Sequence, residues 1–83
     1  MKLIYFSWVR ERIGIEEETV ELPDTVRTTG DLVAWLKQRG PEYANALKDS
    51  DSVRIALDRV HARGNAPLAN ASEVALFPPM TGG

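Results

Sequence analysis

The last six residues combine residue types that could present a reactive group to another protein. Pro78-Pro79 cannot continue a strand ladder and hold the chain extended. Gly82 and Gly83 carry no side chain, so they could enter a channel that admits backbone alone. The group presented would be the α-carboxylate of Gly83, which must be activated before a nucleophile can displace an oxygen. The alternative is that Gly-Gly is an accidental ending or a cloning remnant.

Side chains elsewhere in the sequence do not match the pattern of a catalytic or metal-binding site. The sequence has no cysteine and one histidine, His61, which excludes a thiol nucleophile and a histidine metal pair. The six glycines form no phosphate-binding loop after a strand. Glutamates at positions 16–18 and 21 are better explained as a solvated strand face than as paired catalytic acids. We therefore expect no catalytic residues, no bound cofactor and no metal.

Length and charge narrow the class of protein further. A chain of 83 residues forms one domain, and 43% hydrophobic with 27% charged residues is ordinary for a globular fold. The net charge of −2 provides no basic surface for nucleic acid. No apolar run could span a bilayer, and charges follow the N-terminal residues too soon for a signal peptide. We expect a cytoplasmic protein with no nucleic-acid or membrane partner.

The N-terminal part of the chain predicts a β-hairpin. Residues 2–9 are β-branched and aromatic, which is typical of a strand, with Leu3 and Tyr5 on one face. A short helical turn closing at Gly14 follows. Residues 17–22 then alternate as a half-exposed second strand, which we expect to pair with the first.

The rest of the chain predicts one main helix and three more strands. Thr28 and Asp31 fit a capping box ahead of an apolar run, and Gly40-Pro41 stops the helix. A short helical segment is expected around residues 43–47. The later strands are expected at residues 53–57, 60–62 and 73–77.

This order of elements predicts an α+β fold, the ubiquitin-like β-grasp. Two hairpins flanking one helix build a mixed sheet of about five strands with the main helix packed across one face. We expect residues 1–77 to form the β-grasp domain and residues 78–83 to form an extended reactive tail.

The alternation of the strands also predicts an exposed apolar patch beside the tail. Phe77 faces the same way as Ala75, opposite the core residues of the last strand. If the first and last strands are neighbours, Ile4, Phe6 and Phe77 share one surface, which would suit a docking partner. The alternative is that a loop or a second layer covers these residues. His61 falls on a short edge strand, where a surface position is its ordinary role.

Two stretches, residues 2–11 and 74–83, together with the helix opening at residues 28–36, resemble a known family. The sequence is similar to the small subunits of molybdopterin synthase, the MoaD family of ubiquitin-like sulfur carriers. The ending Phe-Pro-Pro-x-Thr-Gly-Gly at residues 77–83 is the most specific part. Thiamine-pathway carriers share the fold and Gly-Gly but usually lack the proline pair.

The resemblance implies a substrate and donor of sulfur that is not an enzyme on its own. Gly83 would be adenylated by an activating enzyme that uses ATP, and a sulfur donor protein would convert it to a thiocarboxylate. The tail would then enter the synthase large subunit and give sulfur to cyclic pyranopterin monophosphate, in a heterotetramer of two small and two large subunits. The inserted residues would be Pro78, Pro79, Met80, Thr81 and Gly82. The partner surface would include Phe77, Phe6, Ile4, His61 and Arg10.

Three positions depart from the family pattern. Asp58-Arg59 replaces a common Asn-Gly or Asn-Gln turn, which would loosen that hairpin, and Ala71-Ser72 replaces Gly-Asp before the last strand. His61 stands where an aliphatic residue is frequent. Three alternatives stay open: a ubiquitin-like protein modifier, a sulfur carrier of the thiamine or tRNA-thiolation pathway, or a β-grasp interaction domain with an inert tail.

Overall fold

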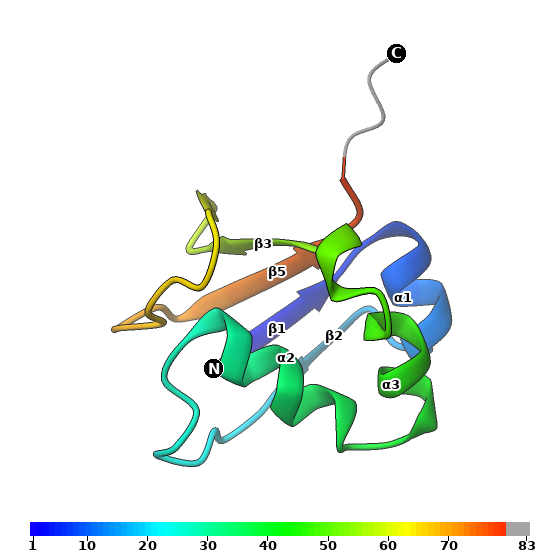
Figure 1. The fold of residues 1–83 in the computed structure, drawn as a ribbon, viewed down its shortest axis with the longest axis horizontal. Helices are drawn as coiled ribbons and strands as arrows, with labels where there is room; N and C mark the ends of the chain where they lie inside the picture. The colour runs from blue at the N-terminus through cyan, green and yellow to red at the C-terminus, as the bar shows by residue number, and fades with distance from the viewer. Residues whose placement is uncertain (80–83) are drawn as a thin grey trace.

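The computed structural model describes residues 1–79, and the predictions for Met80, Thr81, Gly82 and Gly83 lie outside the described residues (Figure 1). Its elements, in chain order, are β1 (Lys2–Tyr5), α1 (Ser7–Ile13), β2 (Glu17–Thr19), α2 (Thr29–Lys37), α3 (Pro41–Leu47), the 3-10 turn η1 (Ser50–Ser52), β3 (Arg54–Leu57), β4 (Val60–Ala62) and β5 (Glu73–Phe77).

The strands form one mixed sheet in the order β2-β1-β5-β3-β4. β1 and β5 run parallel at its centre, with Ile4 opposite Ala75 and Tyr5 opposite Leu76. The pairs β1–β2, β3–β4 and β3–β5 are antiparallel. This order confirms the predicted α+β, ubiquitin-like β-grasp and places the two ends of the domain on adjacent strands (Figure 1).

The prediction of a first strand over residues 2–9 is wrong in its second half. Phe6 is still extended, but Ser7 has a φ of 55° and turns the chain into α1. Val9 and Ile13, one helical turn apart, are both buried on the core side of α1. Their burial outweighs the β propensity of the local sequence. Gly14 ends the helix as predicted, with a φ of 98° and its N–H donated to the Arg10 carbonyl at 2.8 Å.

The predicted main helix is confirmed as α2, but two further helices, α1 and α3, also pack against the sheet. The Thr28 hydroxyl accepts from the Asp31 N–H at 3.1 Å, and the Asp31 carboxylate accepts from the Thr28 N–H at 3.2 Å, which confirms the capping box. α3 contacts both α1 and α2, and the three helices lie on the same side of the sheet (Figure 1). The three helices share one core with the strands, represented by Val9, Leu36 and Leu47 packed with Leu3 and Leu76.

Glu18 is not on a solvated strand face, contrary to the prediction for the glutamates. Its side chain is only 15% exposed and accepts hydrogen bonds from Tyr5 Oη at 2.7 Å, Tyr43 Oη at 2.7 Å and Arg39 Nη1 at 2.8 Å. Burial raises the pKa of this carboxyl, but the bonds from Tyr43, Tyr5 and Arg39 lower it more, so its pKa lies below the ordinary value. The cluster connects β2 and β1 to α3.

The hairpin at Asp58-Arg59 keeps its register despite its unusual sequence. Both residues have positive φ, 47° and 71°, which is the backbone of a tight two-residue turn without the usual glycine. Asp58 Oδ1 accepts from the N–H groups of Ser72 and Glu73, each at 3.0 Å. The Asp58 carboxylate therefore connects the turn to the start of β5. Ser72, one of its two partners, belongs to the Ala71-Ser72 pair that departs from the family pattern.

Candidate functional site

The candidate site begins with the face of the sheet opposite the helices, which we call the open face. Within residues 1–79 its apolar members are Ile4, Phe6, Ala56, Ala75 and Phe77. Each lies one residue away from a side chain that points into the core, such as Tyr5 or Leu76. The period of two along each strand therefore decides which residues line this face.

Strand register aligns these side chains into a continuous surface. Ile4 lies opposite Ala75, and Ala75 lies opposite Ala56 on its other side. The Phe6 N–H donates to the Leu76 carbonyl at 3.0 Å, which continues the register of β1 and β5 one residue past the strand and brings Phe6 beside Phe77. Phe6 is 46% exposed. The structure thus brings Ile4, Phe6 and Phe77 together, while their role in partner binding stays a prediction.

His61 joins this surface from the edge strand. It lies on β4 opposite Ala56, and its ring centroid is 6.1 Å from that of Phe77, with the planes inclined at 53°. Arg54 lies opposite Phe77 on β3 and adds a cation at the same margin. Ala56 and Arg54 were not among the residues predicted for this surface, although the alternation of residues 53–57 places both on the side opposite Ile55.

Charged pairs border the apolar centre of the open face. Lys2 Nζ lies 3.3 Å from Glu17 Oε2 on the β1–β2 side. Arg59 Nε lies 4.0 Å from Glu73 Oε2 on the β3–β5 side. Exposed pairs of this kind stabilise the fold little. An apolar centre with a charged rim is, however, the usual anatomy of a protein–protein interface.

Arg10 lies apart from the strand residues of the open face. It is an exposed residue of α1, and its backbone carbonyl accepts the N–H of Gly14. Its own N–H donates to the Phe6 carbonyl at 3.4 Å, one helical turn back along the chain. Its place on a partner surface stays a prediction.

The tail leaves the domain next to the open face. β5 ends at Phe77, and Pro78 and Pro79 follow as half-buried residues outside any strand. Because Phe77 lies on the open face, a partner that covers this face would also meet the start of the tail. The predicted reactive group at Gly83 lies outside the described residues.

The described residues provide a surface beside the start of the tail. Among residues 1–79 no group of three or more histidine, aspartate or glutamate side chains is arranged to hold a metal ion. Over the same range no helix has the length and apolar character needed to cross a bilayer. The open face is suited to binding another protein, and the tail starts at its margin, directly after Phe77.

The sheet order, the helices on one face and the C-terminal strand at the centre define the ubiquitin-like β-grasp class. Two solved structures share this fold over nearly their whole length. SAMP1 from Haloferax volcanii matches with a TM-score of 0.71 and 25% identity, covering 100% of this chain and 98% of its own. A putative molybdopterin converting factor, subunit 1, from Pyrococcus furiosus matches with a TM-score of 0.72 and 30% identity over 95% of each chain.

Within this class the chain belongs to the ThiS family, whose model matches residues 3–83. It is similar to the molybdopterin synthase sulfur carrier subunit of Chlamydomonas reinhardtii, with 33% identity over 85 residues, covering 100% of this chain and 98% of the relative. The subunits of the same name from Escherichia coli and Haemophilus influenzae are 30% and 29% identical, each over 100% of this chain and 99% of the relative. These matches confirm the resemblance to the sulfur carriers of molybdopterin synthase.

Proposed function

We propose that this protein is the sulfur carrier of molybdopterin biosynthesis, with the C-terminal carboxylate of Gly83 as the sulfur-bearing group. The observation that carries the proposal is the ending Phe-Pro-Pro-Met-Thr-Gly-Gly, which begins at Phe77, the last residue of the central strand β5. Full-length similarity to three subunits named molybdopterin synthase sulfur carrier supports it.

The chemistry follows from the poor reactivity of a carboxylate. Attack of the Gly83 carboxylate on the α-phosphorus of ATP releases pyrophosphate and forms an acyl adenylate. Sulfur at the oxidation level of sulfide, supplied by a donor protein, then displaces AMP and leaves a thiocarboxylate. The described residues contain no nucleotide-binding loop, so we assign the ATP-dependent step to a separate activating enzyme of the adenylyltransferase type.

The thiocarboxylate would act as a nucleophile in the pocket of a second partner. Holding the tail in that pocket supplies most of the rate, because positioning converts a bimolecular step into an effectively unimolecular one. We propose that the open face docks on the synthase large subunit while Pro78 to Gly83 insert. The acceptor is cyclic pyranopterin monophosphate, and two small subunits serve two large ones in the assembled synthase.

Deletion of Gly83 tests this assignment. The truncated chain and the wild type are each incubated with ATP, the activating enzyme, a sulfur donor, the large subunit and cyclic pyranopterin monophosphate. We expect complete loss of molybdopterin formation with an unchanged circular dichroism spectrum and melting temperature. Lys48→Ala, an exposed change just after α3, is the control and should retain full activity. Substantial sulfur transfer by the truncated chain would contradict the proposal.

A further inference from the structure

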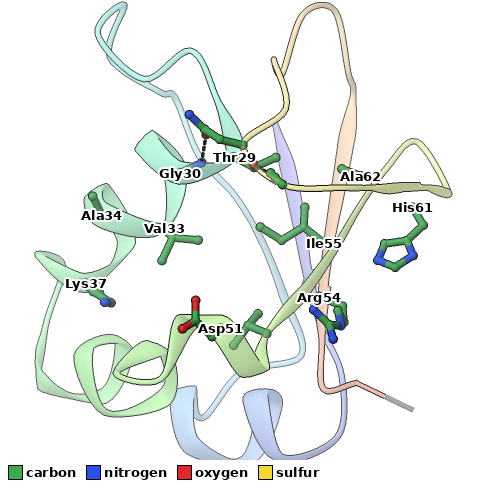
Figure 2. Close-up of a pocket in the computed structure, with 13 residues that line it drawn as sticks. Thr29, Gly30, Val33, Ala34, Lys37, Asp51, Arg54, Ile55, His61 and Ala62 are labelled. Carbon is green, nitrogen blue, oxygen red and sulfur yellow. Dashed lines mark hydrogen bonds between the residues drawn. The ribbon is translucent and has the colours of Figure 1, made fainter.

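A row of side chains crosses the open face at the end where the tail leaves the domain. Its centre is Phe6 beside Phe77, and Arg54 lies opposite Phe77 on β3. Arg54 borders the groove drawn in Figure 2, but its side chain lies on the open face, because it alternates with buried Ile55. In the same view Ile55 points toward α2, while His61 lies on the other side of β3. One end of the row is therefore a cation.

The other end of the row is apolar. The Tyr5 N–H donates to the Glu16 carbonyl at 2.8 Å, which continues the β1–β2 register to the residue before β2. One further step along this register places Ile15 opposite Phe6, on the same face as Glu17. Ile15 is 40% exposed. The row, which we call the exit row, therefore runs from Ile15 through two aromatic rings to the arginine.

The guanidinium at the end of the exit row has no carboxylate from its own face. Arg54 is exposed, and within residues 1–79 it takes part in no ion pair. The acids that the described strands place on the open face are Glu17 and Glu73. Glu17 lies 3.3 Å from Lys2, and Glu73 lies 4.0 Å from Arg59. Charge complementarity at Arg54 therefore favours an acidic group in a partner.

We propose that the exit row orients the synthase large subunit on the open face, with an apolar ridge of that partner against Ile15 and a partner carboxylate against Arg54. This role rests on the proposed function, since the same protein must receive the tail. Because the two ends of the row differ in chemistry, the partner fits in one direction only, which aligns its pocket with Pro78. A second copy of this chain fits less well, because its own exit row contains no carboxylate.

Titration of the large subunit with the full-length protein, followed by calorimetry, tests both ends of the row. Arg54→Glu should weaken binding about tenfold in dilute salt, because an attraction becomes a repulsion, and less in concentrated salt. Ile15→Ser should weaken it about fivefold, because less apolar area is buried. Lys48→Glu and Val60→Ser make matched changes at exposed positions outside the row and should bind as the wild type does. Wild-type affinity in either exit-row variant would overturn the proposal.

The fold should survive all four substitutions, since the four positions are exposed, and circular dichroism melts check this. Loss of pyrophosphate release with the activating enzyme in Arg54→Glu, while its binding to the large subunit is unchanged, would assign the row to that enzyme and overturn the proposal. Sedimentation showing that the wild type self-associates and that Ile15→Ser does not would also overturn it.

Molybdopterin formation by the wild type separates this proposal from the function on which it rests. A wild type that neither binds the large subunit nor forms molybdopterin would overturn both. A wild type that forms molybdopterin, while the exit-row variants bind as tightly as it does, would overturn the role of the exit row alone. With the large subunit in saturating amount, Arg54→Glu should approach the wild-type rate, because the row positions the partner and takes no part in the chemistry at Gly83.

Discussion

The ring centroid of His61 lies 6.1 Å from that of Phe77, although the two residues belong to strands that are separated by β3. This approach joins the edge strand to the strand that leads into the tail. The apolar surface therefore extends from Ile4 on β1 to His61 on β4. A partner that covers it contacts four strands and the start of the tail at once.

Phe77→Ala should weaken binding of the synthase large subunit by about 1–3 kcal/mol, because an aromatic anchor near the centre of an interface is removed. The fold should change little, since Phe77 lies outside the buried core. Isothermal titration calorimetry measures the affinity. Val26→Ala, a half-buried apolar change before α2, is the control and should leave binding unchanged. Equal affinities of Phe77→Ala and wild type would place the docking surface elsewhere.

The two residues of the β3–β4 turn should respond to substitution in opposite directions. Arg59→Gly should stabilise the protein by up to about 1 kcal/mol, because glycine adopts the φ of 71° without the Cβ penalty. Asp58→Ala should destabilise it by about 1–3 kcal/mol, because two backbone N–H groups lose their acceptor. Urea unfolding measures both effects. Loss of stability in Arg59→Gly would show that the arginine side chain matters more than the backbone strain.

Glu18→Gln should destabilise the protein by about 1–3 kcal/mol at neutral pH, because three donors lose an ionised acceptor. The folded-state pKa of Glu18 lies below its ordinary value of 4.5. Its contribution is therefore fully present above that value and lost as the pH falls through the lower, folded pKa. The stability curves of wild type and variant should converge in acid.

Thermal melts from neutral pH into the acid range test this convergence. Glu17→Gln is the matched control, since Glu17 is the neighbouring acid in β2 and its ion pair with Lys2 is about half exposed. It should change stability little at any pH. Parallel curves for Glu18→Gln and wild type would mean that the Glu18 cluster does not contribute to the pH dependence.

Sequence patterns correctly predicted the elements whose conformation depends mainly on residues within the same segment. The Thr28–Asp31 capping box and the alternation of β5 are local signals, and both are confirmed. The second half of the strand predicted over residues 2–9 is helical instead, because tertiary burial of Val9 and Ile13 decided between two conformations. The local residue preferences alone could not supply that contact.

Which residues are neighbours on the open face could be predicted only from the expected order of the strands. Alternation predicted that Ile4 and Phe77 point away from the core, and the β-grasp order made them neighbours. The contact of His61 with Phe77 depends on the pairing of β4 with β3 and of β3 with β5, which no single segment encodes. Glu18 was misplaced for a similar reason, because its two tyrosine partners are distant in the sequence.

The mass of the C-terminal peptide, after reaction with ATP, the activating enzyme and a sulfur donor, tests the central claim most directly. We predict replacement of one oxygen by sulfur at Gly83, seen as a mass increase equal to the difference between the two atoms. Omission of ATP should abolish the exchange. An unchanged Gly83 carboxylate, or a Gly83 found in an isopeptide bond to lysine of another protein, would contradict it.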